Sequence, residues 1–500
     1  MKKHVLPAAM LALTLAGFSS TSQAWDPTTA PDLELFMSGA SGMDGAITAL
    51  FDNLCENSAS EPKDYYRDGT SGANYRAFFC TLTPAKVAGL SAPKKVLFIK
   101  RSAGGSAQGV NPLVEGKAID ALNIQNSNCT ETAAGSHVWN CSISKTGDLV
   151  AKNPNIGISD VDPFMFRGPN TPTGFSPITQ AGTQLLEIRS VAALIFGVPV
   201  TNGLYDALQT VQIDKNELPS TCTIGSYTEA CMPSLSTHQI SSLVSGQIKK
   251  WSEFYVNFNG TDYPLTQYPG VTNKPTSDLV AFCKRTAGSG TGAQQYAKFL
   301  NSPCTRCALP PIEPAASNPI DGPLVLANGS SGVMDKCLDD FEKGANTSAL
   351  NAGLVKAWAF GQQALEKNAD NKLAYKFVKV DGVAPTLKNA ANGTYKDWVE
   401  PTYQWRKTGA GAPAGDLLKI IDKLVVEAGS PTSVATVLNK ASNYTFGKSG
   451  YLAVASNGHP FTNVLDENAP VIGYSHAASG KLDNCNIPVL PADPATKKPL

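Results

Sequence analysis

The sequence predicts an α/β protein with largely parallel sheets, because short apolar runs typical of strands alternate with amphipathic segments typical of helices. Three times, such a strand leads into a turn of small residues that precedes a helical pattern. In the clearest case, residues 279–283 enter a glycine-rich turn over 284–292, and helical spacing of apolar residues follows over 293–300. Ligand sites in this class of fold lie beyond the carboxyl ends of strands, so we expect the three turns to face one site.

The turn over residues 284–292 has the composition of an anion-binding loop. Glycines let backbone N–H groups converge, and a helix start adds unpaired donors and a partial positive charge. Arg285 can hold an oxyanion with a two-pronged, charge-assisted contact, and Ser289 and Thr291 add hydroxyl donors. The alternative is an ordinary helix start with a surface arginine.

The other two turns follow the strands expected over residues 33–37 and 96–100, and they occupy residues 38–42 and 101–106. Residues 156–163 contain a further short strand that ends at two carboxylates, Asp160 and Asp162. These positions place small hydroxyl side chains and acids at the ends of strands, where a polar ligand would be met. The alternative for Asp160 is a helix-cap or turn aspartate.

The remaining chain continues the alternation. The continuous apolar run 191–200 predicts a buried strand that crosses between lobes, and residues 235–254 predict a helix capped by Ser236. The segment 328–333 begins another helix and offers a second candidate anion cradle, although an ordinary helix start is the preferred interpretation. Strands are expected over residues 357–360 and 375–380, an amphipathic helix over 417–425 and a polar tail over 480–500.

Residues 1–24 have the pattern of a secretory signal peptide, with two lysines, an apolar stretch and Ser22-Gln23-Ala24 before Trp25. Export agrees with the eleven cysteines, which indicate disulfides in an oxidising compartment. Near neighbours in the sequence suggest three disulfides, and at least one thiol is left unpaired within the chain. Cys304 and Cys307 could instead form a redox or zinc pair, but the prolines around them favour a loop. The suggested disulfides are Cys55–Cys80, Cys129–Cys141 and Cys222–Cys231.

Charge excludes some partners. The full chain has 41 basic and 41 acidic residues, and cleavage of the signal peptide would remove two lysines, leaving 39 basic residues and a net charge of −2. No later run is long enough to span a bilayer. We therefore expect neither nucleic-acid binding nor membrane insertion, and any anion must be held by local geometry.

Taken in order, these motifs resemble the type 2 periplasmic solute-binding proteins, specifically the PstS-like phosphate-binding component of the ABC phosphate importer. The pieces that match are residues 38–41, 102–105, 159–160, 246–251 and 285–291, with a weaker piece at 381–386. The resemblance is patchy but collinear. It covers most of the chain outside three insertions, at about residues 111–150, 214–234 and 301–323.

The resemblance implies two α/β lobes with disulfide-stapled insertions, joined by two crossing segments and closing on phosphate. Lobe 1 would comprise residues 25–196 and 401–500, including the tail, and lobe 2 residues 197–400. Asp160 would accept a hydrogen bond from protonated phosphate and repel fully ionised sulfate. The phosphate ligands carried over from the family are Ser41, Ser102, Asp160, Arg285, Ser289, Gly290 and Thr291.

One position departs from the family. The loop usually reads Arg-x-Asp-Gly-Ser-Gly-Thr, whereas the acidic position is Ala287 here. An acid there could orient the arginine, so Arg285 is expected to be freer or to have a partner elsewhere, which would affect the affinity and the choice of anion.

The sequence thus predicts an exported, periplasmic or secreted protein that binds inorganic phosphate or a similar oxyanion for uptake or scavenging. The resemblance implies the membrane subunit of an ABC transporter as a partner. No cofactor, metal or catalytic residue is predicted, and the protein is expected not to be an enzyme. One alternative is a secreted phosphatase on the same scaffold, although no base lies beside Ser41, Ser102 or Ser289 in the sequence. The other is an extracellular structural or adhesion protein.

Overall fold

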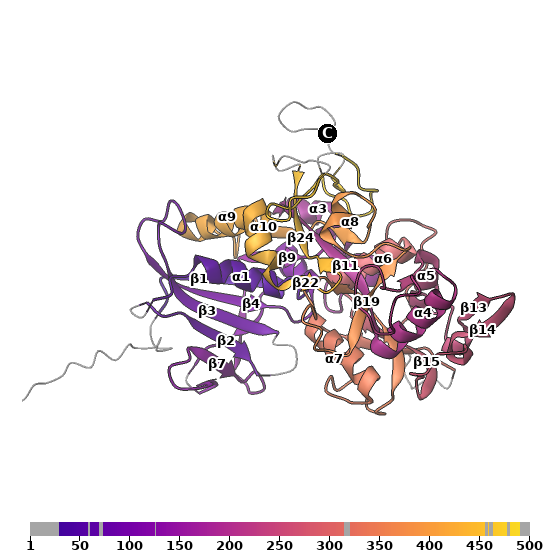
Figure 1. Ribbon diagram of the computed structural model, residues 1–500. Coiled ribbons are helices and arrows are strands. Elements are labelled where there is room, and N and C mark those ends of the chain that lie inside the picture. Colours follow the sequence, from indigo (N-terminus) through magenta and orange to yellow (C-terminus); the bar gives the residue numbers. More distant parts are fainter. Residues whose placement is uncertain are drawn as a thin grey trace, which may run out of the picture.

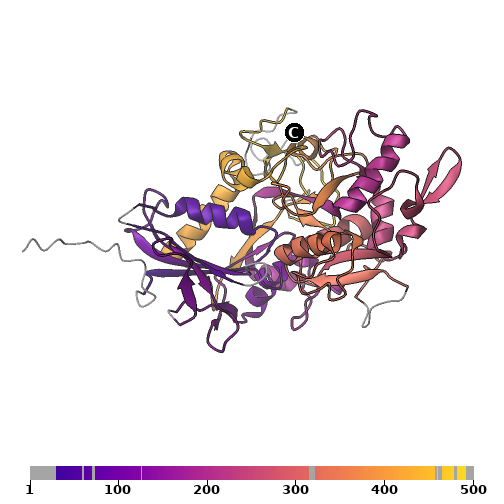
Figure 2. The same ribbon diagram turned by 60° about the horizontal axis from the view of Figure 1, so that its bottom comes forward.

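The computed structural model describes residues 30–58, 61–69, 74–125, 127–314, 321–455, 459, 464–477 and 481–490. The predicted signal peptide lies outside these ranges. The described chain forms two α/β units, each built on one large sheet that contains parallel strands, and the units lie side by side in both views (Figure 1, Figure 2). The predicted α/β class is confirmed, although each sheet mixes parallel with antiparallel strands instead of being largely parallel. No helix among the described residues is long and apolar enough to cross a membrane.

The first sheet has nine strands in the order β10-β21-β9-β1-β4-β3-β2-β7-β6. At its centre, β1 (Leu33–Gly39) is parallel to β4 (Lys94–Arg101) and to β9 (Ile156–Ser159), as expected from the sequence. The carboxyl ends of these three strands therefore meet at one edge. The other strands are β2 (Asp64–Asp68), β3 (Tyr75–Leu82), β6 (Cys129–Glu131), β7 (Val138–Cys141), β10 (Leu186–Ser190) and β21 (Thr402–Arg406).

Two helices from opposite ends of the chain pack against one face of this sheet. They are α1 (Asp44–Leu54) and α9 (Gly415–Gly429), drawn in indigo and yellow at the left of Figure 1, and they contact each other. The opposite face packs a smaller apolar core against β5 (Ile119–Leu122) and β8 (Leu149–Lys152). The expected insertion at 111–150 thus covers and extends the sheet.

The second sheet has ten strands, and the order along its main path is β12-β19-β11-β17-β15-β16. Here β15 (Ser277–Arg285) is parallel to both β16 (Leu324–Asn328) and β17 (Ala357–Phe360), so another set of strand ends meets at one edge. The other strands are β11 (Ala192–Thr201), β12 (Ser234–Leu235), β18 (Gln363–Ala364), β19 (Tyr375–Val380), β20 (Trp398–Val399), β24 (Tyr451–Val454) and β25 (Val471–Ile472).

Strand β11 belongs to both units. All ten of its residues are buried, as the apolar run predicts. Ala193 and Ile195 lie in the core of the second unit, whereas Leu194 and Phe196 lie in the core of the first. Successive side chains of a strand point to opposite faces, so one strand supplies both cores where they meet.

The helices of the second unit are α4 (Asn202–Asp214), α5 (Thr237–Val244), α6 (Gly290–Leu300) and α7 (Ser331–Lys343). Ser236 caps α5 as predicted, with a reciprocal bond from Gln239. The expectation of a helix over 235–254 is wrong beyond Val244. Gly246 has a φ of 70°, a left-handed conformation that ends helices.

Short elements complete the fold. They are α2 (Asn111–Glu115), α3 (Gln180–Gln184), α8 (Leu387–Ala391), α10 (Pro431–Thr436), the hairpin of β13 (Tyr255–Phe258) and β14 (Thr261–Pro264), and the pair β22 (Asn443–Tyr444) and β23 (Gly447–Lys448). The 3-10 helices are η1 (Ser106–Gly109), η2 (Pro163–Met165), η3 (Gly168–Asn170), η4 (Trp251–Glu253), η5 (Leu265–Gln267) and η6 (Leu438–Ala441).

The three disulfides suggested by the sequence are present, and Cys283–Cys337 and Cys304–Cys485 join them. Cys307 is the free, exposed cysteine. Because Cys304 is bonded to Cys485, Cys304 and Cys307 form neither a disulfide with each other nor a zinc pair in this structure.

Candidate anion-binding site

Three helices begin where the two units meet. Ser41 precedes α1, Ser289 caps α6 by accepting a bond from the N–H of Gly292, and Ser330 caps α7 by accepting one from Val333. Each helix follows the carboxyl end of a strand, namely β1, β15 or β16. Helix starts carry a partial positive charge and unpaired N–H groups, so this region is electrostatically prepared for an anion.

Arg285, the last residue of β15, joins these helix starts. Its Nη2 donates to the Oγ of Ser41 at 3.1 Å, its Nη1 to the Oγ of Ser331 at 3.0 Å, and its Nε to the carbonyl of Asn328 at 3.2 Å. The backbone N–H of Ser331 also donates to the Oγ of Ser41, at 3.1 Å. The side chains that converge on this guanidinium therefore come from both units.

The guanidinium of Arg285 is 1 % exposed, yet among the described residues no carboxylate oxygen lies within 4.0 Å of its nitrogens. Burial lowers the pKa of Arg285 to about 10, although Asp160 and Asp335 act in the opposite direction from further away. Buried charges are normally paired, so an unpaired one indicates a missing counter-ion. With alanine at position 287, Arg285 has neutral partners elsewhere, as expected: the carbonyl of Asn328 and the hydroxyls of Ser41 and Ser331.

Asp160, which follows β9, is equally buried at 1 % exposure. Its Oδ2 accepts a bond from the Oγ1 of Thr291 at 3.1 Å, whereas its Oδ1 has no hydrogen-bond partner. Burial raises the pKa of Asp160, and the charge of Arg285 offsets this only in part. Oδ1 packs against Gly42, where an added Cβ would lie 3.0 Å away. Because the Oδ1 of Asp160 has no partner, it can accept a hydrogen bond from a ligand that carries a proton.

The structure places Ser102 differently from the other predicted residues. Its Oγ donates to Oδ1 of Asp44 at 2.6 Å and accepts a bond from Lys100 at 2.8 Å. Asp44 is also paired with Arg76 at 2.8 Å and with Lys100 at 3.3 Å. We call these four residues the Asp44 cluster. Ser102 is thus committed to a buried ion-pair network, and no contact joins it to Arg285.

Two hydroxyl groups at the site were not predicted. Ser331 contacts Arg285 directly, although the motif at 328–333 was interpreted as an ordinary helix start. The Oγ of Ser106 accepts the backbone N–H of Asp160 at 3.1 Å. Both are in motifs that the sequence singled out, but whether a given serine faces the site depends on the geometry of the turn.

The two units touch across the site. The N–H of Ala107 donates to the carbonyl of Gly288 at 2.8 Å. An added Cβ at Gly290 would lie 2.5 Å from the Oγ of Ser106 and 2.7 Å from the Cβ of Asp160, so only glycine fits between them. All the predicted site residues are buried. Ligand exchange therefore requires the two sides to separate, as in hinged two-lobe proteins.

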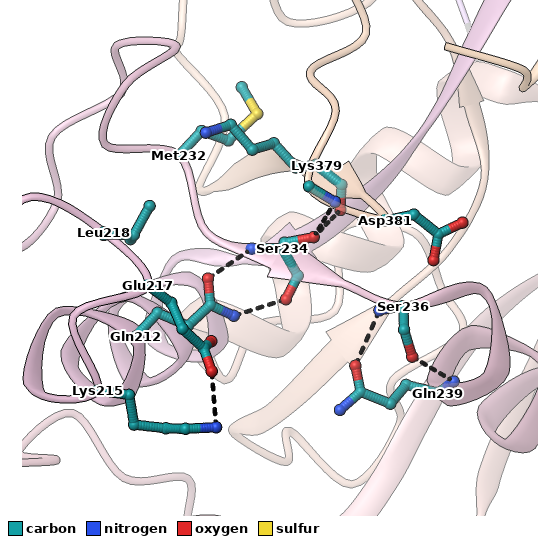
Figure 3. Close-up of a pocket in the computed structure, with 11 residues that line it drawn as sticks. Gln212, Lys215, Glu217, Leu218, Met232, Ser234, Ser236, Gln239, Lys379 and Asp381 are labelled. Atoms are coloured by element: carbon teal, nitrogen blue, oxygen red, sulfur yellow. Dashed lines mark hydrogen bonds and ion pairs between the residues drawn. The ribbon is translucent and has the colours of Figure 1, made fainter. Parts of the chain in front are cut away.

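Elsewhere, a cavity of about 420 Å³ opens beside β12 and the start of α5 (Figure 3). Much of its polar lining is already paired. Gln212 exchanges two hydrogen bonds with the backbone of Ser234, Lys215 pairs with Glu217 at 2.7 Å, and Ser236 bonds to Gln239. Because these groups satisfy one another, this cavity is a weaker candidate than the region around Arg285.

No family model and no curated protein matches the sequence. Among solved structures, the fold is similar to phosphate ABC transporter substrate-binding proteins. One from Clostridium perfringens, solved with bound phosphate, is 14 % identical, with 82 % of this chain and 98 % of that chain covered and a TM-score of 0.40. An ABC-type phosphate transport receptor from Vibrio cholerae is 13 % identical, with 78 % and 93 % covered and a TM-score of 0.35.

PstS from Borrelia burgdorferi is 10 % identical, with 79 % and 92 % covered and a TM-score of 0.30. The contacts around Arg285, and not this likeness, carry the functional proposal.

Proposed function

We propose that this protein is an exported binding protein for inorganic phosphate or a similar oxyanion, acting in uptake or scavenging. The observation that carries the proposal is the buried guanidinium of Arg285, which has hydroxyl and carbonyl partners but no carboxylate within ion-pair distance among the described residues. A bound oxyanion would supply the missing negative charge, and the starts of α1, α6 and α7 would add N–H donors.

The hydroxyl groups are suited to donating. Ser41 and Ser331 each accept a bond from Arg285, and their oxygens lie 3.3 Å apart. A hydroxyl that accepts a hydrogen bond from a cation keeps its own proton to donate. Ser41 and Ser331 can form only one hydrogen bond with each other, so one of their two O–H groups is available to donate to an anion oxygen.

Asp160 would provide selectivity. Phosphate near neutral pH retains a proton that the unpaired Oδ1 can accept, whereas sulfate has none to offer. Sulfate would therefore leave the carboxylate unpaired and close to a second negative charge. Leaving a buried polar group unsatisfied costs about 1–3 kcal/mol, and more for charged groups, so phosphate is expected to be favoured by at least about fivefold.

The contacts favour binding over hydrolysis. A serine nucleophile needs a neighbouring base to remove its proton, whereas Ser41 and Ser331 accept hydrogen bonds from a cation. Two of the histidines are bonded to acids elsewhere, His137 to Asp64 and His476 to Glu400. We therefore propose a receptor and not a phosphatase, one that would deliver its ligand to the membrane subunit of an ABC transporter.

Calorimetric titration of ligand-stripped protein with phosphate and then with sulfate tests the proposal. We expect heat on phosphate addition, little on sulfate addition, loss of binding in Arg285→Ala, and a smaller preference for phosphate in Asp160→Asn. Arg189→Ala is the control, because this arginine is exposed and paired with Glu187. Absence of heat with both anions in the native protein would contradict the proposal and favour a structural or adhesive role.

A further inference from the structure

Three cysteines lie close to one another in the fold, and two of them are disulfide-bonded. Cys304 follows α6 in a turn and is bonded to Cys485, which is 181 residues later in the chain. Cys307 is three residues after Cys304, exposed and free. The residues around Cys485, numbers 483–486, are called the C-terminal strap below.

The strap is attached to both sides of the anion site. On the Asp160 side, the N–H of Asp162 donates to the Oδ1 of Asn484 at 2.5 Å, and the Sγ of Cys485 lies 3.8 Å from the Sδ of Met165. On the other side, the bond to Cys304 joins the strap to the loop after α6, the helix that begins with Gly290 and Thr291. The strap thus links elements that must separate for a ligand to pass, by a disulfide on the α6 side and by noncovalent contacts on the Asp160 side.

We propose that Cys304, Cys307 and Cys485 form a thiol–disulfide exchange site that releases this tie. The thiolate of Cys307 attacks the Sγ of Cys304, a bond forms between these two sulfurs, and the Cys304–Cys485 bond breaks. Cys485 leaves with the electron pair as a thiolate and then takes up a proton. One disulfide and one thiol are present before and after, so the step requires no oxidant or reductant.

Two features favour this direction. The backbone of residues 302–307 is a run of turns, and Cys304 and Thr305 both donate to the carbonyl of Asn301, so the chain is compact where Cys307 must reach Cys304. On the strap, Nη2 of Arg167 lies 4.0 Å from the Sγ of Cys485. A cation beside a sulfur stabilises its thiolate, and thiols that are better leaving groups are expelled faster.

The exchange would convert a form in which the two sides of the site are held together into one in which they can separate. With Cys304 bonded to Cys485, the site residues on α6 and beside β9 stay close. With Cys304 bonded to Cys307, the strap retains only its noncovalent contacts with residues 162–167. The inference concerns separation of the two sides, and it holds whichever anion the site binds.

Disulfide mapping by mass spectrometry under non-reducing conditions tests the exchange. Protein held at mildly alkaline pH is quenched with an alkylating agent over time. We expect alkylation to move from Cys307 to Cys485 as a Cys304–Cys307 disulfide accumulates. Cys307→Ser should keep the Cys304–Cys485 bond throughout, and Arg167→Gln should exchange about threefold more slowly than the native protein, with Arg167→Lys restoring the rate.

A second measurement reports opening without any ligand. Hydrogen–deuterium exchange of peptides covering residues 286–293 should be faster in the exchanged form than in Cys307→Ser. Cys485→Ser, in which the tie cannot form, should show the same increase and, after incubation with glutathione disulfide as the two-electron oxidant, a Cys304–Cys307 disulfide. The proposal is overturned if native Cys307 remains alkylatable and unpaired throughout, if Cys485→Ser keeps two free thiols after that oxidation, or if the exchanged protein is as protected as the native one.

Discussion

Two buried basic clusters lie near the junction of the units, and they differ in how their charge is balanced. In the Asp44 cluster, Arg76 and Lys100 share the carboxylate of Asp44. Burial alone would raise the pKa of Asp44, but the two cations outweigh it and hold the pKa below its ordinary value. Around Arg285, in contrast, the nearest contacts are hydroxyl and carbonyl oxygens.

The comparison separates structural charge from functional charge. A buried cation that has its own carboxylate contributes to the fold and offers little to a ligand. A buried cation without one destabilises the empty protein and gains from any anion that arrives. The same difference explains why Ser102, in the first cluster, and Ser331, in the second, are expected to have different roles despite both following strand ends.

The largest effect is expected for Asp44→Ala, which would leave the buried Lys100 and the partly buried Arg76 without their acid. Breaking a buried ion pair in this way typically costs about 3–5 kcal/mol. Urea denaturation should show a loss of that size. Asp52→Ala is the matched control, because Asp52 is on the same helix but its ion pair with Lys63 is partly exposed, and it should cost less than about 1 kcal/mol. A loss of stability in Asp44→Ala no larger than that in Asp52→Ala would mean that the Asp44 cluster contributes little to the stability of the fold.

Arg285→Met should act in the opposite direction on the empty protein. Methionine fills much of the same space without charge, and replacing buried charge with apolar groups is often neutral or stabilising by about 1–4 kcal/mol. We expect unchanged or higher stability together with loss of phosphate binding, measured by urea denaturation and calorimetry. A strong destabilisation would show that Arg285 is already paired in the empty protein.

Asp160→Asn should stabilise the empty protein in a pH-dependent way. The pKa of Asp160 is raised by burial in the folded state, so stability is lost as the pH rises from its ordinary value near 4 through the raised pKa. Asparagine does not ionise, so Asp160→Asn does not lose stability in this pH range. At pH 7 we expect a gain of about 1–3 kcal/mol, and at pH 4 almost none, in thermal unfolding. A gain of the same size at both pH values would assign the effect to packing.

The smallest effect distinguishes two serines. Ser331→Ala removes a hydroxyl that contacts Arg285 and should weaken phosphate binding by roughly tenfold. Ser102→Ala removes one that contacts Asp44, so the affinity should stay within about twofold while stability falls by about 1 kcal/mol. Calorimetry and urea denaturation of both variants provide the check. If Ser102→Ala weakened phosphate binding and Ser331→Ala did not, Ser102 would be a phosphate ligand as the sequence predicts.

Much of the fold could be predicted from the sequence, because the apolar runs of β1, β4, β11 and β15 and the spacing in α1, α6 and α9 are strong local signals. The end of α5 could not, since it depends on a left-handed glycine at Gly246. At the site, Arg285 and its glycine-rich turn were identifiable from composition. The orientation of Ser102 and Ser331 was not, because it depends on a partner distant in the chain: Ser102 meets Asp44, 58 residues away, and Ser331 meets Arg285.

Strand β11 has a consequence for how the molecule unfolds and how it can evolve. From Ala193 to Phe196 its successive side chains are anchored alternately in the two cores, so neither unit can lose its structure without removing part of the other's interior. We expect a single cooperative transition instead of two. A one-residue insertion just before Ala193 would exchange the two sets of side chains at residues 193–196, and recombination at this strand would disturb both halves at once.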